Sequence, residues 1–378
     1  MFAQAAASLV FMGVILMLDI FPAKYLALLG AALVFLWSLT LNLQMVRRRT
    51  KAFGKVLSIL LVAALSLGSY YVLKANDTLG MIADDNPEEE VDEKITKEPF
   101  TVYISGIDVM HDPSSGKLVN SEGESGQERS DVNILAVVNP QTRQILLVTT
   151  PRDYYVVIPG ISEGMSDKLT HAGLYGVDAS MDTLAALYET EIKYYARMNF
   201  NALIEIVDTL GGVDVYSECE FTTGYESSGN DTFTVTKGYN HLNGARALAF
   251  SRERNNLPEG DFQRGRNQQA VITAMMRKML SPAMLLKAGS VMSSVGENAE
   301  TNLSRAQING LIKYQLDNGA KWSVKSIAAE GIPEDNYCYS LEGVANVVVP
   351  DEESVQSIIG EINLVEEGGT LEGAQALE

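Results

Sequence analysis

The chain has 378 residues, a length that fits a membrane anchor followed by one or two soluble units. Its 29 basic and 48 acidic residues give a net charge of −19 at pH 7. The acidic excess is concentrated after residue 77, because residues 78–378 hold 22 bases and 46 acids. This balance argues against nonspecific binding to nucleic acid or anionic lipid, so a polyanionic ligand must meet a local basic cluster.

Three apolar runs fill the first 77 residues, at about 5–21, 25–45 and 56–73. Each is close to the ~20 residues that a helix needs to cross hydrocarbon, which predicts a three-span membrane anchor over residues 1–77. A buried helical hairpin of a soluble protein is the alternative. The neutral start differs from a cleaved signal peptide, so we expect the anchor to be retained in the cell membrane. Five of the seven bases of this segment lie between Arg47 and Lys55, which predicts a cytoplasmic loop there and an extracytoplasmic location for residues 78–378.

The remaining chain divides into three parts by composition. Residues 78–98 are acidic and weakly apolar, which indicates a solvated linker. Residues 99–330 alternate strand and helix patterns, which predicts a layered α/β domain with a central mixed sheet flanked by helices. Residues 331–378 form a C-terminal extension whose tail after Asn363 is expected to be disordered. The strand patterns lie at 101–107, 132–138, 144–149 and 322–327, and the helix patterns at 179–190, 200–210, 242–249, 261–280 and 303–316.

Cys219 and Cys338 lie in the part assigned to the extracytoplasmic side, where a disulfide is chemically permitted. The sequence leaves a disulfide and two unbonded thiols as equal alternatives. The three histidines are scattered and no paired Cys/His spacing occurs, which argues against a zinc site.

Asp108 and Asp131 stand at the edges of two predicted strands, in Gly106-Ile107-Asp108 and Arg129-Ser130-Asp131. Two carboxylates with few other hard ligands suit Mg²⁺, which completes its octahedral coordination with water and substrate phosphate. Turn-capping aspartates are the alternative, and the spacing alone favours them.

Pro151-Arg152-Asp153 follows directly after an apolar strand. Ligands of α/β sheets bind beyond the strand ends, so Arg152 is placed where it can hold a phosphate, and Asp153 where it can orient the ligand or accept a proton. A structural Arg-Asp pair is the alternative reading.

A second basic group is formed by Arg252 and Arg254 in Ser251-Arg252-Glu253-Arg254, together with Arg264 and Gln268. Arg252 and Arg254 point the same way in an extended segment, and Arg264 and Gln268 share a helix face at i and i+4. Guanidinium groups bind phosphate oxygens in pairs and stay charged, which suits a pyrophosphate. A solvated basic helix end is the alternative.

At these positions the sequence resembles the LytR-CpsA-Psr family, over roughly residues 100–327. The resemblance is carried in order by VYISGID, RSDVNILAVVN, ILLVTTPRDYYV, DKLTHAGLYGVD, VDTLGGVDVY, GYNHLNGARALAFSRERN and GDFQRGRNQQAVI. It implies transfer of a glycopolymer, such as a capsular polysaccharide or a teichoic-acid-like polymer, from a polyprenyl-pyrophosphate carrier in the membrane to peptidoglycan. It also implies an apolar slot for the polyprenyl chain, for which the 200–210 and 271–280 helices offer apolar faces, although core packing is the more ordinary role of such faces.

The resemblance assigns roles residue by residue. It implies that Asp108 and Asp131 are Mg²⁺ ligands, and that the pyrophosphate is held by Arg152, Arg252, Arg254, Arg264 and Gln268. Asp131, Arg152 and Asp153 are the expected catalytic residues.

Two departures from the family pattern concern the site. Some relatives have Arg-Gln-Gln where this chain has Asn267-Gln268-Gln269, and we expect Arg266 to replace the missing charge. The segment between Asp108 and Asp131 is long and acidic. Three spans resemble the capsule-associated branch and favour a capsular polymer. A polyprenyl-pyrophosphate hydrolase, a lipid-phosphate binding regulator without turnover and a signalling receptor are the rival functions.

Overall fold

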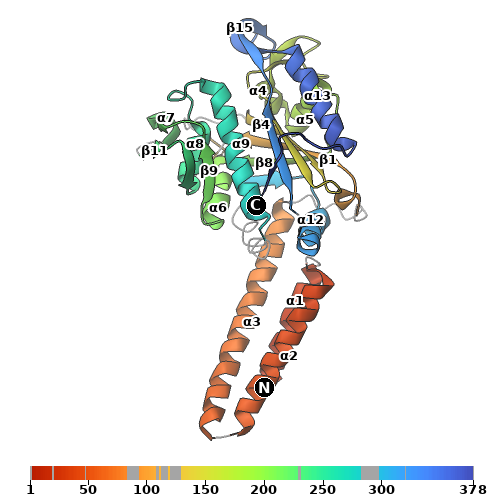
Figure 1. The fold of residues 1–378 in the computed structure, drawn as a ribbon, viewed down its shortest axis with the longest axis vertical. Coiled ribbons are helices and arrows are strands. Elements are labelled where there is room, and N and C mark those ends of the chain that lie inside the picture. The colour runs from red at the N-terminus through yellow and green to blue at the C-terminus, as the bar shows by residue number, and fades with distance from the viewer. Residues whose placement is uncertain are drawn as a thin grey trace.

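The computed structural model describes residues 2–18, 21–46, 48–82, 93–107, 110–111, 118–119, 129–228, 231–281, 298–319 and 321–377. Asp108, most of the acidic segment after it and residues 83–92 of the predicted linker lie outside these ranges. An α/β domain stands at one end of a bundle of three helices (Figure 1).

The three helices of the bundle are α1 (Phe2–Leu18), α2 (Ala23–Val46) and α3 (Arg48–Ile82). Two of them are long and apolar enough to cross a membrane, over Ala23–Met45 and Thr50–Lys74. Only 6% and 11% of the residues in these two stretches are buried, as expected of helices that face lipid and unlike the core helices of a soluble protein. α1 is apolar but shorter. Of the three expected spans, two helices reach spanning length, and they suggest a membrane anchor.

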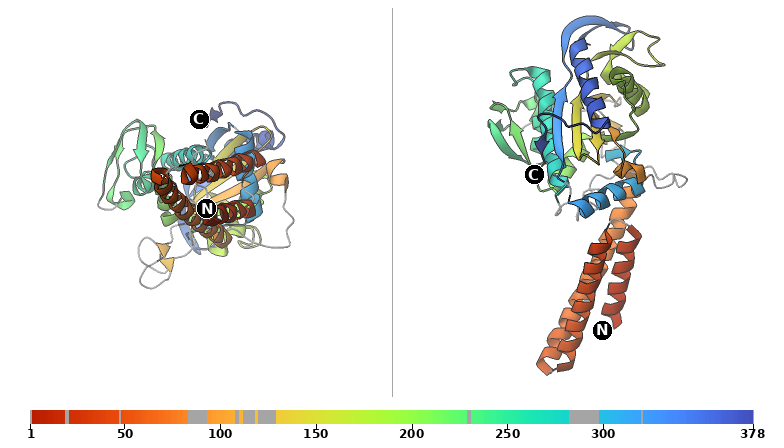
Figure 2. Two further views of the ribbon diagram at one scale, coloured as in Figure 1. Left: turned by 90° about the horizontal axis from the view of Figure 1, so that it is seen from below. Right: turned by 45° about the vertical axis from the view of Figure 1, so that its right-hand side comes forward.

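The first turn of α2 contacts the α/β domain. Lys24 Nζ donates to the backbone oxygen of Asp317 at 2.7 Å and lies 3.3 Å from its carboxylate, and the Tyr25 hydroxyl donates to Leu316 O at 3.3 Å. Both partners belong to α12 (Arg305–Asn318), which lies at the base of the domain beside the helices (Figure 2). The junction between α2 and α3 lies at the opposite end of the bundle (Figure 1).

A seven-stranded mixed sheet forms the centre of the domain, in the order β13-β8-β1-β4-β5-β14-β17. Continuous apolar runs in β4 and β5 bury both of their faces, so these strands lie in the middle of the sheet. The predicted hairpin of these two strands is confirmed by their antiparallel pairing. The strands are β1 (Phe100–Ile107), β4 (Ser130–Asn139), β5 (Gln144–Thr149), β8 (Tyr194–Asn199), β13 (Ala299–Thr301), β14 (Ser323–Ala328) and β17 (Gln375–Ala376).

The directions of these strands create one functional edge. β1 pairs in parallel with β8, and β5 pairs in parallel with β14. β4 runs antiparallel to both β1 and β5. The carboxyl ends of four strands and the start of β4 therefore meet at one edge. The loop after β5 and the first turns of helix α9 (Gly260–Met279) place their polar side chains there.

Helices cover both faces of the sheet. One face packs against α9 (Gly260–Met279) and α12, through a core that includes Ile134, Leu147 and Trp322. The other face packs against α5 (Val177–Tyr188) and α13 (Glu352–Glu366), through a core that includes Tyr103 and Leu135. The layered α/β architecture expected from the sequence is confirmed.

A further core lies beside the sheet. It is formed by α6 (Phe200–Thr209), α8 (Gly244–Arg252), the face of α9 away from the sheet, and the ribbon of β9 (Val213–Ser217) and β12 (Gly238–Leu242). α8 begins at a point of close approach, where a Cβ on Gly244 would lie 2.3 Å from the backbone oxygen of Ile204. Only glycine fits there. The short elements are η1 (Glu93–Thr96), β2 (Met110–His111), β3 (Leu118–Val119), β6 (Tyr155–Val157), β7 (Ser166–Lys168), α4 (Leu169–Ala172), η2 (Gly173–Tyr175), β10 (Phe221–Thr222), α7 (Tyr225–Ser228) and β11 (Thr234–Val235).

The C-terminal extension is folded, and the expectation of a disordered tail after Asn363 is wrong. A hairpin of β15 (Gly331–Cys338) and β16 (Gly343–Pro350) leads into α13, whose Ile358, Ile362 and Val365 are buried against the sheet. Leu371 is also buried, and β17 adds a strand to β14. The acidic, glycine-rich composition of the tail concealed a few apolar residues that are sufficient to attach it to an existing core.

Cys219 and Cys338 are both unbonded thiols. The sequence left open a disulfide or two unbonded thiols, and the structure contains two unbonded thiols.

Candidate functional site

An open cavity of about 540 Å³ lies at the edge of the sheet where β5 and β14 end and β4 begins, and the first turns of α9 form its opposite wall. Five of the residues predicted from the sequence line it. They are Asp131, Arg152, Asp153, Arg264 and Gln268.

The loop after β5 fixes the position of Arg152 and Asp153. The Thr150 amide donates to Asn133 O at 2.9 Å, so the chain still follows β4 as it leaves the sheet. Three residues later the Asp153 carbonyl accepts a hydrogen bond from the amide of Val348 at 2.8 Å. The buried Tyr154 anchors the end of this segment. Backbone bonds and burial on both sides therefore hold the two charged residues at the cavity.

Charges of alternating sign run along the cavity wall. Arg152 Nη1 donates to Asp131 Oδ1 at 2.7 Å, and Arg152 Nε lies 3.6 Å from Asp153 Oδ2. The other oxygen of Asp153 accepts from Lys168 Nζ at 2.8 Å. The four side chains are between 17% and 29% exposed, so they are in contact with water but are not fully solvated. An anionic ligand in this cavity would compete with Asp131 for Arg152.

α9 supplies the second wall. Arg264 and Gln268 are one turn apart, which places both on the cavity side as the i, i+4 spacing predicted. Gln268 Nε2 donates to Ser251 O at 3.3 Å and so connects α9 with the end of α8. α9 lies close to β5 at this point, since a Cβ on Gly265 would be in ordinary van der Waals contact with the Thr149 methyl group, at 3.5 Å.

Arg252 and Arg254 are not among the described residues that line the cavity. The guanidinium of Arg252 stacks over the Phe200 ring, with 4.6 Å between Cζ and the ring centroid. Phe200 follows the end of β8, so Arg252 lies at the same edge of the sheet, beyond β1 and β8. Arg254 is exposed. The predicted convergence of all four arginines on one cavity is therefore present for Arg152 and Arg264 only.

Glu253 sets the conformation of the turn between Arg252 and Arg254. Its side chain is buried and accepts hydrogen bonds from the Gly224 amide and the Ser227 hydroxyl, both at 2.6 Å. It also accepts from the amides of Arg254 and Asn256, each at 3.1 Å. Burial raises the pKa of Glu253, but these hydrogen bonds to the carboxylate outweigh burial and lower the pKa below its ordinary value.

Arg266 does not replace the charge that some relatives carry at position 267, contrary to our expectation. Its guanidinium pairs with Glu218 and Glu259, both at 3.0 Å, on the outer surface of α9. Asn267 is buried and donates to Phe250 O at 3.4 Å. Consecutive helix residues point about 100° apart, so Arg266 and Asn267 face different surroundings.

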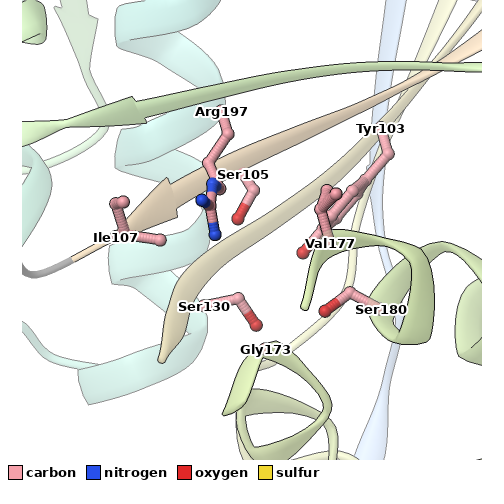
Figure 3. A pocket seen from close by; sticks show the side chains of 8 residues that line it. All are labelled: Tyr103, Ser105, Ile107, Ser130, Gly173, Val177, Ser180 and Arg197. Carbon is pink, nitrogen blue, oxygen red and sulfur yellow. The ribbon is translucent and has the colours of Figure 1, made fainter. Parts of the chain in front are cut away.

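A second, smaller cavity of about 180 Å³ lies between the ends of β1, β4 and β8 and the η2–α5 segment (Figure 3). Tyr103, Ser105, Ser130 and Ser180 bring hydroxyl groups to its lining, and the Arg197 guanidinium reaches into it from β8 (Figure 3). The apolar faces at 200–210 and 271–280 instead pack into the core beside the sheet. In the part of the chain that the structure describes, these two helix segments line neither cavity, and their ordinary packing role is confirmed.

A buried pair lies directly behind Lys168. His171 Nδ1 is 2.6 Å from Asp167 Oδ1, and the Ser340 amide donates to Asp167 Oδ2 at 2.8 Å. The Asp167 side chain is fully buried. Burial raises the pKa of Asp167, but the hydrogen bonds from His171, Ser340 and the Lys168 amide outweigh it and lower the pKa to about 2.

The carboxylates offer limited metal-binding capacity. Within the described ranges no group of three or more His, Cys, Asp or Glu side chains is placed to hold a metal ion. Asp131 and Asp153 both face the cavity with hard oxygen donors of the kind that Mg²⁺ prefers. Mg²⁺ needs only one or two protein oxygens when a phosphate supplies others, so this donor set fits the ion.

The model of the LytR_cpsA_psr family matches residues 66–358, which is well over half of the chain. The chain belongs to the LytR_cpsA_psr family. Curated relatives in this family include two proteins named polyisoprenyl-teichoic acid–peptidoglycan teichoic acid transferase TagU. The protein from Bacillus cereus is 32% identical over 71% of this chain and 80% of the relative. The protein from Enterococcus faecalis is 33% identical over 67% of this chain and 78% of the relative.

Solved structures of the family have the same fold. The TagU structure from B. subtilis matches with a TM-score of 0.52 and 27% identity, over 73% of this chain and all of that chain. A structure described as TagT bound to LIIa-WTA matches with a TM-score of 0.55 and 25% identity, over 75% of this chain and 98% of that chain.

Sequence reasoning missed three residues at the cavity. Lys168 lies in the quoted DKLTHAGLYGVD motif, and its position before a helix gave no sign that it reaches Asp153. Phe262 lies in the GDFQRGR motif and lines the cavity beside Arg264. Val348 comes from the C-terminal extension, and no local pattern indicates that β16 returns to the loop after β5.

Proposed function

We propose that this chain is a membrane-anchored glycopolymer transferase that moves a polymer from a polyprenyl-pyrophosphate carrier to peptidoglycan. The observation that carries the proposal is the cavity at the sheet edge, which collects Asp131, Arg152, Asp153, Arg264 and Gln268 from separate segments in a chain of this family. Membership of the family and the names of the transferase relatives support the reaction class.

The polymer is proposed to be teichoic-acid-like, with a capsular polysaccharide as the second choice. This chain covers about four-fifths of the length of relatives that are named teichoic acid transferases. The preference for a capsule rested on three membrane spans, and two helices reach spanning length. The names of the relatives are therefore the stronger support.

In this proposal Arg152 and Arg264 hold the pyrophosphate from opposite walls of the cavity, and Gln268 donates a further hydrogen bond. Guanidinium groups suit this task because each presents two parallel donors to phosphate oxygens. Arg252 and Arg254 lie farther along the sheet edge and are proposed to contact the polymer side of the substrate. Electrostatic positioning is the main demand of phosphoryl transfer, so these donors supply most of what the reaction requires.

The reaction exchanges one phosphorus–oxygen bond for another. An acceptor sugar hydroxyl forms a bond to the phosphorus next to the polymer, the bond from that phosphorus to the bridging oxygen breaks, and polyprenyl phosphate leaves. Asp108 and Asp131 would hold Mg²⁺, which supplies positive charge to the phosphates when it is bound. Asp153 is placed to orient Arg152 or to accept the proton of the hydroxyl.

The anchor is proposed to have three spans, with Arg47–Lys55 in the cytoplasm and residues 78–378 outside. The contact of the start of α2 with α12 supports this arrangement, because it puts that end of α2 and the catalytic domain on one side of the bundle. The Arg47–Lys55 end of the bundle is then on the other side, as the positive-inside rule requires.

A reconstituted transfer assay tests the function. The full-length protein in detergent or nanodiscs is mixed with a polyprenyl-pyrophosphate-linked saccharide, Mg²⁺ and peptidoglycan fragments. The proposal expects saccharide phosphate on the fragments and release of polyprenyl phosphate. Release of polyprenyl phosphate that is independent of the acceptor would identify a hydrolase. Tight lipid binding without either product would identify a binding regulator. Either the hydrolase result or the regulator result would contradict the proposal.

A further inference from the structure

Lys168 contacts the cavity wall without lining the cavity. Its ammonium group lies 2.8 Å from Asp153 Oδ1, and Asp153 in turn lies 3.6 Å from Arg152 Nε. Arg152 completes the series through its 2.7 Å contact with Asp131. The series therefore alternates in sign from Lys168 to Asp131. Arg152 lies between two carboxylates, and Asp153 also contacts a second cation, Lys168.

The backbone fixes Lys168 relative to Arg152. Leu169 N donates to Tyr154 O at 2.9 Å and Thr170 N donates to Arg152 O at 2.8 Å, so the residues after Lys168 are bonded to the Arg152 loop. On the other side the Lys168 amide donates to the buried Asp167 carboxylate at 2.8 Å. A residue held this firmly presents its charge at a defined point, which a mobile surface lysine does not.

We propose that Lys168 is a positioning residue for the pyrophosphate site, an inference that rests on the proposed function. By occupying one oxygen of Asp153, Lys168 keeps that carboxylate from closing on Arg152. Arg152 then faces one strong competitor, Asp131, and can turn its guanidinium to a phosphate. Without the ammonium group, Asp153 pairs fully with Arg152, and an incoming phosphate has to displace two carboxylates.

The chain contains a matched control for this role. Lys325 Nζ lies 2.6 Å from Glu361 Oε1, and the side chains of this pair are 20% and 25% exposed, against 17% and 22% for Lys168 and Asp153. Partly exposed ion pairs contribute little to stability, so methionine in place of either lysine leaves the domain folded. Lys325 is not part of the cavity wall, so only Lys168→Met changes the surroundings of Arg152.

The test measures binding of geranylgeranyl pyrophosphate to the detergent-purified full chain. Lys168→Met is expected to weaken binding roughly tenfold, consistent with the scale of one charge-assisted contact, and Lys325→Met to leave it within about twofold. Lys168→Arg should restore most of the affinity. In an Asp153→Asn background, which removes the competing charge, Lys168→Met should have no further effect. This non-additivity is the signature of a residue that acts through its neighbour.

Equal losses for Lys168→Met and Lys325→Met, or an undiminished loss in the Asp153→Asn background, would overturn the inference. If the unmodified chain does not bind geranylgeranyl pyrophosphate, the proposed function fails instead. A crystal structure of Lys168→Met without ligand then decides the role of Lys168. If two guanidinium nitrogens of Arg152 pair with Asp153 in that structure, the inference is supported. If Arg152 remains paired with Asp131 alone, the inference is contradicted.

Discussion

The two groups of arginines in this chain are held in different ways. Arg152 and Arg264 line a cavity, and Arg152 is balanced between the carboxylates of Asp131 and Asp153. Arg252 stacks on Phe200, and the turn that carries it is fixed by the buried Glu253 carboxylate, which accepts hydrogen bonds from the Gly224 amide and the Ser227 hydroxyl. Arg152 of the first group is held by charges that a ligand can displace. The second is held by packing and by hydrogen bonds that a ligand does not reach.

This difference indicates that arginines in neighbouring motifs are not equivalent binders. An arginine whose partners are half-exposed carboxylates can exchange them for phosphate oxygens at small cost, because the charges on both sides of the exchange are similar. An arginine stacked on an aromatic ring keeps that contact while its outer edge binds a ligand. We therefore expect the first group to determine pyrophosphate affinity and the second to have smaller effects.

The largest effect is expected at Asp131, the partner of Arg152. Asp131→Ala should reduce turnover at least about 10²-fold, the typical cost of losing a group that stabilises developing charge. Pyrophosphate binding without Mg²⁺ should be unchanged or tighter, because the variant removes the competitor for Arg152. Transfer rates and calorimetric titration with geranylgeranyl pyrophosphate measure the two quantities. Weaker binding in the variant would show that Asp131 does not compete for Arg152.

The next prediction compares the two arginine groups directly. Arg264→Ala removes a charge-assisted contact of about 1.5–3 kcal/mol and should weaken pyrophosphate binding roughly tenfold to a hundredfold. Arg254→Ala should weaken it by no more than about threefold, because this exposed side chain is outside the cavity. The same titration measures both variants. Equal losses would return Arg254 to the pyrophosphate site and remove the distinction between the groups.

The third prediction concerns the stability of the Arg252–Arg254 turn. Glu253→Ala leaves the Gly224 and Asn256 amides without their acceptor, which should cost about 1–3 kcal/mol and lower the melting temperature by roughly 2–10 °C. Glu218→Ala is the control, since its exposed carboxylate pairs with Arg266 at the surface. Scanning fluorimetry measures both. A melting temperature for Glu253→Ala that equals the control value would exclude an anchoring role.

The smallest effect is expected from Asp167, which lies behind the first group. Its pKa of about 2 is below the ordinary value of 3.8, so the ionised carboxylate stabilises the folded state above pH 3.8. That contribution is lost as the pH falls from about 3.8 to about 2. Asp167→Asn should therefore flatten the fall in the urea midpoint over this range. Asp214→Asn, which alters an exposed His241 pair, is the control and should leave the fall unchanged.

Much of the fold could be predicted because its elements have strong local patterns. The β4–β5 hairpin has two continuous apolar runs around a turn, and α6 ends at Gly211-Gly212 as its sequence indicates. The tail could not be predicted, since its attachment depends on a core that is formed by distant residues. Leu371 is one apolar residue in an acidic segment, and only the finished sheet gives it a place to pack.

The candidate site was predicted in part for the same reason. Arg152 and Asp153 follow a strand end, and Arg264 and Gln268 share a helix face, as the sequence indicated. The family resemblance, not spacing, placed them in one site. Arg252 and Arg254 were expected in the same cavity because alternate residues of an extended segment point one way. In the structure α8 ends at Arg252, so Arg252 extends from the helix end and Arg254 from the turn that follows. The Lys168 contact depends on β-ribbon pairing that has no local signature.

The most direct test of the account is a crystal structure of this chain with a bound polyprenyl pyrophosphate analogue. The account predicts that both phosphates lie in the cavity between Arg152 and Arg264, within hydrogen-bond distance of both guanidinium groups and of the Gln268 amide. It also predicts that Arg152 has turned from Asp131 toward the ligand while Asp153 remains on Lys168. Phosphates bound at another edge of the domain, with the Arg152–Asp131 pair intact, would contradict it.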